Sequence, residues 1–304
     1  MRTASGPNPA VSAVRLVHTA ERIREWTRAY RRAGLCVGFV PTLGGLHAGH
    51  SALLRRARQE CDRVVASIYL NPTQFDCPED LDGYPSTREE DVSACRAGGV
   101  DLLWLGRSQD FLSEGFQTWV EVEELTSPLC GVGRPGHFRG VTTVVMQLLQ
   151  VVLPHRVYFG LKDYQQTCVV TRMAEDLNLD VDIRLVETAR EPDGLALSSR
   201  NARLAPPQRQ AALVIWRALS KARRRVLEGE RSVEAVSHAL CTELQSEPLV
   251  RVEYADVRDA RTLELLEAGE LRLDGAGTLL AVAVQLGPVR LIDNVVLRHE
   301  GTGG

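Results

Sequence analysis

The sequence predicts an α/β fold: a doubly wound, Rossmann-like parallel sheet followed by a second, smaller α+β domain. Between residues 14 and 188, short apolar runs alternate with longer segments of helical periodicity, which is typical of βαβ units. After residue 189 the order changes to two helical segments and then three strand-like segments. We therefore expect a loose tail over residues 1–13, a nucleotide-binding domain over 14–188 and a C-terminal lid domain over 189–304.

Composition excludes several classes of protein. The 36 Lys and Arg side chains are balanced by 39 Asp and Glu, for a net charge of −3, so no overall positive field attracts nucleic acid. No stretch approaches the roughly 18 apolar residues of a membrane span, and the N-terminal residues lack the apolar core of a secretory signal. Seven scattered cysteines without a Cys-x-x-Cys pair indicate a reducing compartment. We expect a cytoplasmic protein.

The first half begins with a helical period over residues 14–33, ended by Gly34, and a first strand over 35–40. A helix follows to about residue 61. The run at 63–70 is almost continuously apolar, as in a strand covered on both faces. We predict further helices at 87–98, where Thr87 and Glu90 form a capping box, 140–153 and 163–177, and strands at 100–105, 118–125 (a short edge strand), 156–159 and 181–186.

The second half opens on the turn signal Pro-Asp-Gly at residues 192–194. Ser232 is a good N-cap for a helix, and Pro248 stands where that helix should have ended. The predicted elements are helices at 207–227 and 232–246, followed by strands at 252–257, 278–286 and 289–297.

Residues 41–50, Pro-Thr-Leu-Gly-Gly-Leu-His-Ala-Gly-His, join the first strand to the next helix. Free backbone N–H groups and the helix dipole at such a point attract phosphate. His47 and His50 can add donors to a phosphate whose charge grows during a reaction. The alternative is that both are polar residues satisfied at a helix start.

Ligands of doubly wound sheets lie beyond the carboxyl ends of the strands, so polar residues that follow strands are candidates for a site. Thr42, the Asn71 to Phe75 loop and the Gly160 to Gln166 segment occupy such places. The amides of Asn71 and Gln74 suit hydroxyls or an uncharged amine, and Lys162 suits phosphate or carboxylate. Asp163 could accept from ribose hydroxyls or cap the helix. An ordinary turn and an ordinary helix start are the alternatives.

Three further groups stay open at this level. Residues 197–201, Leu-Ser-Ser-Arg-Asn, could close on phosphates through Arg200 or form a polar surface connection. His137 could reach the site or cap the apolar helix that follows it. The acidic residues at 89–91 could help to hold Mg²⁺ or form a solvated first helical turn, although Mg²⁺ is more plausibly carried by nucleotide phosphates.

Taken together, these motifs resemble the pantothenate synthetase (pantoate–β-alanine ligase) family of the His-x-Gly-His nucleotidyltransferase superfamily. The likeness spans about residues 14–297, with the motifs in order. It rests on the 41–50 stretch and on Tyr-Leu-Asn-Pro-Thr-Gln-Phe (69–75), Glu-Asp-Leu-Asp-Gly-Tyr-Pro (79–85), Arg-Pro-Gly-His-Phe-Arg-Gly-Val (134–141), Lys-Asp-Tyr-Gln-Gln (162–166) and Ser-Ser-Arg-Asn (198–201).

The resemblance implies a ligase that condenses (R)-pantoate with β-alanine through a pantoyl adenylate, releasing pyrophosphate and AMP, in the biosynthesis of vitamin B5 and coenzyme A. It implies a homodimer whose C-terminal domain closes over ATP, with Mg²⁺ on the phosphates. His50, His47 and Lys162 are the implied catalytic residues. The implied ATP contacts are Leu43, Gly44, Gly45, Leu46, His47, Ala48, Gly49, His50, Gly160, Leu161, Lys162, Asp163, Ala189, Leu197, Ser198, Ser199 and Arg200, and the substrate contacts are Gln74, Gln166, Asn71 and His137.

The sequence departs from the family at a few positions. The family usually has Met at Leu43, Ala at Gly45, Glu at Ala48, Arg at Ser86 and Glu at Leu161. Leucine for methionine conserves volume, whereas the loss of two carboxylates changes the local charge. The alternatives are a nucleotidyltransferase of the same superfamily with another acceptor and a catalytically weak nucleotide-binding paralogue.

Overall fold

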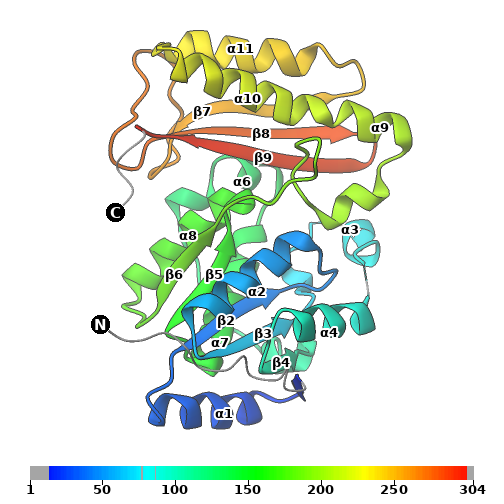
Figure 1. The fold of residues 1–304 in the computed structure, drawn as a ribbon, viewed down its shortest axis with the longest axis vertical. Helices are drawn as coiled ribbons and strands as arrows, with labels where there is room; N and C mark the ends of the chain where they lie inside the picture. The colour runs from blue at the N-terminus through cyan, green and yellow to red at the C-terminus, as the bar shows by residue number, and fades with distance from the viewer. Residues whose placement is uncertain (1–13, 77, 86, 300–304) are drawn as a thin grey trace, which may run out of the picture.

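The computed structural model describes residues 14–76, 78–85 and 87–299. Its first sheet has six strands, all parallel, and Figure 1 shows it in the lower half of the molecule. The strands are β1 (Arg15–Val17), β2 (Val37–Thr42), β3 (Arg63–Ile68), β4 (Leu102–Leu105), β5 (Arg156–Gly160) and β6 (Asp182–Val186), in the order β1-β4-β3-β2-β5-β6.

Helices cover both faces of this sheet. The helices of this unit are α1 (Ala20–Arg32), α2 (Ala48–Glu60), α3 (Pro78–Asp82), α4 (Arg88–Ala97), α5 (Ser108–Phe111), α6 (Cys130–Gly133), α7 (His137–Val152) and α8 (Tyr164–Asp176), of which α3 and α6 are short and do not lie on a face of the sheet. Successive strand residues alternate between two cores: Phe39 packs with α1, α7 and α8, whereas Val40 packs with α2 and α4. Burial on both faces explains why β2 and β3 are apolar without interruption.

The second unit is an antiparallel sheet of three strands, in the order β7-β8-β9, with helices on one face (Figure 1). Its elements are α9 (Pro206–Ala211), α10 (Leu213–Leu227), α11 (Val233–Gln245), β7 (Arg251–Asp259), β8 (Thr278–Leu286) and β9 (Val289–Leu297). The predicted α/β class with a smaller α+β unit is confirmed. Within the described ranges, no helix is both long and apolar enough to span a membrane.

The start of the chain corrects one prediction. Residues Arg15–Val17 are not the first turn of a helix but an edge strand, parallel to β4, and the helix begins only at Ala20. Thr19 caps that helix by accepting from the N–H of Arg22. The expected single helix at 207–227 is likewise two, α9 and α10, which meet at Ala212.

The edge strand expected at 118–125 is also wrong. All eight of these residues are described and none belongs to a strand, because the backbone at Val120 is bound by helix α7 instead. The Oγ1 of Thr142 donates to the Val120 carbonyl at 2.6 Å, and the Val120 N–H donates to Oγ1 of Thr143 at 3.0 Å. Side-chain hydroxyls therefore satisfy the backbone groups that a neighbouring strand would have satisfied.

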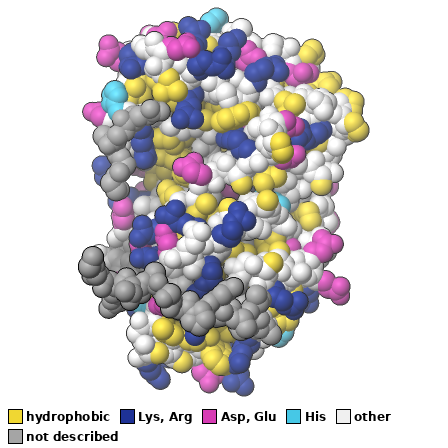
Figure 2. Space-filling model, viewed as in Figure 1, with side chains coloured by type: hydrophobic (Ala, Val, Ile, Leu, Met, Phe, Trp, Pro, Cys, Tyr) yellow, Lys and Arg dark blue, Asp and Glu magenta, His cyan; other side chains and the backbone are white. Residues whose placement is uncertain are grey.

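The two units share a small apolar core. The Tyr164 hydroxyl also crosses between them, donating to the Ala260 carbonyl at 2.9 Å. The shared core consists of Leu129 and Tyr164 from the first unit and Ala260, Leu263, Leu279 and Ala281 from the second. Figure 2 shows side chains of both charges and many apolar ones distributed over one face of the molecule, without a single dominant charged patch.

Candidate active site

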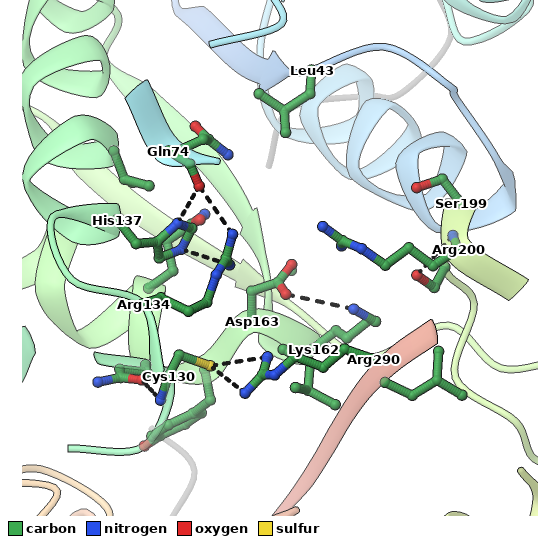
Figure 3. Close-up of a pocket in the computed structure, with 18 of the residues that line it drawn as sticks. Leu43, Gln74, Cys130, Arg134, His137, Lys162, Asp163, Ser199, Arg200 and Arg290 are labelled. Carbon is green, nitrogen blue, oxygen red and sulfur yellow. Dashed lines mark hydrogen bonds and ion pairs between the residues drawn. The ribbon is translucent and has the colours of Figure 1, made fainter. Parts of the chain in front are cut away.

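The strand order reverses between β2 and β5, because the chain runs from β2 to β3 and β4 on one side and from β5 to β6 on the other. Ligands of doubly wound sheets bind at such a switch point. A cavity of about 860 Å³ lies there, lined by residues of both units. In Figure 3, Leu43, Gln74, Lys162, Ser199 and Arg200 converge on it from separate segments. Adjacency of β2 and β5 thus brings motifs more than 100 residues apart in the chain to one site.

His47 and His50 form the start of helix α2 and cap it together. The His47 N–H donates to Nδ1 of His50 at 3.2 Å, and the Gly49 N–H donates to Nδ1 of His47 at 3.1 Å. Both Nδ1 atoms are acceptors, so each neutral ring carries its proton on Nε2. A side chain at Gly49 would lie within 2.9 Å of the His47 ring, so only glycine allows this cap.

Burial keeps this histidine pair uncharged. It lowers the pKa of His50 to about 3, helped by the neighbouring His47, and lowers the pKa of His47, helped by the charge of Lys162. Near pH 7 the two rings therefore offer neutral Nε2–H donors, and the fixed positive charge comes from elsewhere in the site.

Asp91 on helix α4 has a role that neither interpretation of the acidic residues at 89–91 predicted. Only 2% exposed, it accepts from the N–H groups of Gly45 (3.0 Å) and Leu46 (2.7 Å). Thr87 donates to the same carboxylate, so the predicted capping box does not form. Asp91 is therefore neither a metal ligand candidate nor a solvated helix residue but the support of the glycine turn.

Asp91 and the helix cap use four of the N–H groups that were expected to be free for phosphate, whereas the amides of Leu43, Gly44 and Ala48 stay predicted phosphate donors. Gly45 and Leu46 donate to Asp91, and His47 and Gly49 donate within the cap. Side-chain donors, rather than these four amides, face the cavity. The turn's main contribution is to fix where the two imidazoles stand.

Gln74 is held on three sides. Asn71 Nδ2 donates to Gln74 Oε1 at 3.1 Å, which leaves the Gln74 Nε2 available to a ligand. The Gln74 carbonyl accepts from Nδ1 of His137 at 2.7 Å and from Arg134 at 3.0 Å. Burial, with the charge of Arg134, lowers the pKa of His137 to about 4. With Nδ1–H on this carbonyl and Nε2 facing Arg134 at 3.3 Å, the neutral ring of His137 is fully used in holding the loop.

Asn71 itself lies behind the cavity wall. It is 0% exposed, its Oδ1 accepts from the N–H and hydroxyl of Thr73, and its Nδ2 also donates to the Gly140 carbonyl. Gly140 has no side chain because a Cβ would lie 2.5 Å from the Thr73 carbonyl oxygen. Asn71 therefore orients Gln74 instead of contacting a ligand, which corrects its assignment as a substrate contact.

The two adjacent glutamines have different roles: Gln165 holds the structure together, and Gln166 belongs to the candidate site. Gln165 is buried and ties the chain at residues 125–130, donating to the carbonyls of Leu125 and Pro128 and accepting from the Cys130 N–H. Gln166 lines the cavity. Part of the cavity wall is apolar, formed by Val141, Val144, Val145, Leu148 and Phe159, which belong to one hydrophobic cluster.

The cationic end of the cavity is formed by Lys162 and Arg200. Lys162 Nζ lies 3.5 Å from the Asp163 carboxylate, in the turn between β5 and α8, and Asp163 makes no capping bond to that helix. Arg200 donates to Asp80 at 2.7 Å, and Arg203 donates to the same carboxylate at 2.9 Å. Burial opposes ionisation of Asp80, yet these two guanidinium groups lower its pKa.

Most of the predicted contacts line the cavity, and some lie behind it. Those lining it are Leu43, His47, Gly49, His50, Gln74, His137, Gly160, Lys162, Asp163, Gln166, Ala189, Leu197, Ser198, Ser199 and Arg200. Gly44, Gly45, Leu46, Ala48, Asn71 and Leu161 are not part of its wall. Over the part of the chain that is described, no three His, Cys, Asp or Glu side chains form a group that could hold a metal ion.

Known proteins share this architecture. The family model described as pantoate-beta-alanine ligase matches residues 15–296. The pantothenate synthetase of Geobacter sulfurreducens is 46% identical over 287 residues, which cover 94% of this chain and 100% of the relative. That of Heliobacterium modesticaldum is 46% identical over 286 residues, 93% of this chain and 99% of the relative.

Solved structures agree with the sequence relatives. The pantothenate synthetase of Thermus thermophilus superposes with a TM-score of 0.85 at 42% identity, covering 94% of this chain and 100% of its own. The pantoate-beta-alanine ligase of Francisella tularensis, crystallised with beta-gamma ATP and β-alanine, gives a TM-score of 0.75 at 29% identity, covering 93% and 98%. Since model, sequence and structure match over nearly the full length, this chain belongs to the pantoate–β-alanine ligase family.

Proposed function

We propose that this protein condenses (R)-pantoate with β-alanine to pantothenate, using ATP and releasing AMP and pyrophosphate. The observation that carries the proposal is that two kinds of group line one cavity. His47, His50, Lys162 and Arg200 suit phosphates, whereas Gln74, Gln166 and apolar side chains suit a small branched hydroxy acid. In Figure 3, Gln74 lies across the cavity from Ser199 and Arg200. The Francisella enzyme, crystallised with beta-gamma ATP and β-alanine, supports ATP and β-alanine as substrates.

The reaction runs in two steps. The pantoate carboxylate attacks the α-phosphorus of ATP, forming pantoyl adenylate and expelling pyrophosphate. The neutral amine of β-alanine then attacks the activated carbonyl carbon, the bond from that carbon to the AMP oxygen breaks, and the nitrogen loses a proton to solvent as the amide forms. Adenylation is needed because a carboxylate is a poor acylating group, and the protein's main work is to align the reactants and stabilise charge on the phosphates.

Each cationic or donor group has a place in the first step. The Nε2–H donors of His47 and His50 stabilise the charge that develops on the phosphate oxygens, without transferring a proton. Lys162 offsets charge at the α-phosphate, and Arg200 with Ser198 and Ser199 holds the β- and γ-phosphates. Walls from both units exclude water, which protects the acyl adenylate from hydrolysis.

Mg²⁺ would be carried by the nucleotide phosphates and would offset part of their charge. The carboxylates near the phosphate-binding groups already have cationic partners: Asp80 is bound by Arg200 and Arg203, and Asp163 lies against Lys162. The phosphates are therefore the better ligands for the ion. We also propose a homodimer, as the family resemblance implies, and a cytoplasmic location, as the scattered cysteines indicate.

The test is pantoate-dependent exchange of pyrophosphate into ATP, followed by AMP release on addition of β-alanine. We expect exchange with pantoate alone and AMP release only with both substrates. His50→Ala should abolish exchange and leave the folded structure intact, as judged by circular dichroism. ATP binding without exchange in the presence of pantoate would refute the proposal and leave the catalytically weak paralogue as the better description.

A further inference from the structure

Asn294, on strand β9, reaches out of the C-terminal unit to the turn that carries Lys162. Its Nδ2 donates to the Leu161 carbonyl at 3.0 Å and to the Lys162 carbonyl at 2.9 Å. An amide nitrogen has two hydrogens, so this one atom satisfies both carbonyls and has no donor left. Asn294 is 8% exposed, so these bonds are shielded from water.

The turn depends on this outside support. Residues Leu161–Asp163 form a single 3₁₀ turn between β5 and α8; Gly160 before it has no side chain that could cap the turn, and Asp163 at its end makes no side-chain capping bond. A Cβ at Gly160 would have no heavy atom within 4 Å, so no side chain packs against the turn from that direction. The two bonds from Asn294 are therefore a principal constraint on the backbone from which the Lys162 side chain departs.

Asn294 is itself held in place by its neighbour. Asp293 accepts the Asn294 N–H at 2.8 Å and forms a two-bond ion pair with Arg190, at 2.6 and 3.0 Å. Arg190 in turn stacks on Trp216, 3.7 Å from the ring centre, beside the segment that contains Ala189 and Leu197. Asp293 and Asn294 of β9 thus contact the two segments beside the proposed phosphate-binding groups: the turn that carries Lys162 and the segment that contains Arg190.

We propose that Asn294 is a positioning residue that acts through Lys162. By binding the two carbonyls, it fixes the position of the Lys162 ammonium relative to the α-phosphate. Because Asn294 belongs to the C-terminal unit, that position depends on how this unit packs on the first one. A displacement of about 1 Å of a reacting group can cost roughly 100-fold in rate. The inference rests on the role proposed above for Lys162, and the test separates the two.

The sharpest variant is Asn294→Asp, which conserves shape and volume but turns the donor into an acceptor facing two carbonyl oxygens. We expect its pantoate-dependent exchange rate at saturating substrates to fall about 30- to 100-fold, with KM for pantoate changed less than about threefold. Asn294→Ala is the second variant, with the same expectation. The matched control is Cys168→Ala, which removes another contact between the units, from Sγ to the Ala260 carbonyl at 3.8 Å, away from the cavity wall, and should change the rate less than about threefold. Thermal unfolding of all three identifies any variant that does not fold.

Repeating both Asn294 changes in a Lys162→Ala background tests the route of the effect. If Asn294 acts through Lys162, their cost should shrink to less than about threefold in that background, because interacting residues are not additive. The same fractional loss in both backgrounds, or near-normal exchange by Asn294→Asp, overturns the inference. Near-normal exchange by Lys162→Ala alone would instead refute the role proposed for Lys162. The bonds from Asn294 to that turn would then be structural only, and the inference would fail with that role.

Discussion

The backbone N–H of His47 donates to Nδ1 of His50 at 3.2 Å, and the two imidazole rings lie 4.3 Å apart. His50 therefore does two things at once: Nδ1 caps the helix, and Nε2–H is left for a ligand. These two functions use opposite edges of one ring, so substitutions that mimic one edge can separate them.

We expect His50→Asn, whose side-chain oxygen can occupy the place of Nδ1, to retain most of the stability and lose exchange activity by about 100-fold or more. His50→Gln places an amide N–H near the former Nε2 and should retain more activity, while losing the cap at a cost of about 1 kcal/mol. Urea unfolding and pyrophosphate exchange measured on the same preparations check this. The opposite ranking of activities would show that capping, not the Nε2–H donor, is what catalysis requires.

Asp91→Asn should damage the glycine turn. The variant replaces one of two carboxylate oxygens that accept from buried N–H groups, and we expect about 2 kcal/mol of lost stability together with weaker use of ATP. Urea unfolding and kcat/KM for ATP are the measurements. Glu90→Gln is the control, since it makes a similar change at an exposed neighbour, and its stability should change by less than about 0.5 kcal/mol. Equal effects of the two variants would contradict the support assigned to Asp91.

His137 should make stability depend on pH. Its folded-state pKa, about 4, lies below the ordinary value of 6.5, so the folded protein resists a proton that the unfolded chain accepts. This contribution is fully present above pH 6.5 and is lost as the pH falls toward 4, by up to about 3 kcal/mol. His137→Asn keeps a donor for the Gln74 carbonyl but cannot titrate. Its free energy of unfolding should therefore fall less steeply between about pH 6.5 and 4.5; an unchanged slope would refute the assignment.

Asp80 competes with the triphosphate for Arg200. Asp80→Asn removes a negative charge next to a guanidinium proposed to bind phosphate, and we expect ATP to bind about three- to tenfold more tightly, equivalent to roughly 1 kcal/mol. Titration calorimetry with ATP measures this. Asp82→Asn is the control, because it makes the same change of charge in the same helix. Among the described residues, Arg200 pairs with Asp80 and not with Asp82, so this variant should change the affinity for ATP less. Weaker binding by Asp80→Asn would indicate that the Asp80 contact assists binding instead.

Local patterns in the sequence predicted the class of fold and most of its elements. Strands β2 and β3 were predictable because burial on both faces demands continuous apolar residues, and helix ends were marked by residues such as Gly34 and Pro248. Strand β1 was missed because three residues show no period, and it exists only through pairing with β4. The predicted boundary between the domains, at residues 188 and 189, stays a prediction.

Site residues that directly follow strands could be predicted from the sequence. Residues that hold the site in place from distant parts of the chain could not. His47, Gln74, Lys162 and Arg200 stand out in motifs, but their mutual placement depends on the order of the strands, which no local pattern encodes. Asp91 acts on amides 45 and 46 residues away in the chain. Acidic residues at a helix start are common, and nothing in the sequence distinguished the one that turns inward.

The apolar core shared by Leu129, Tyr164 and the second unit has a consequence for how the chain is made. A ribosome releases the first unit well before residues 260–281, which cover that core, have been synthesised. During this interval the nascent chain carries an uncovered apolar patch next to a nearly finished sheet. Such surface is prone to aggregation and is the kind that chaperones bind. A truncated protein ending near residue 188 should keep that exposure permanently.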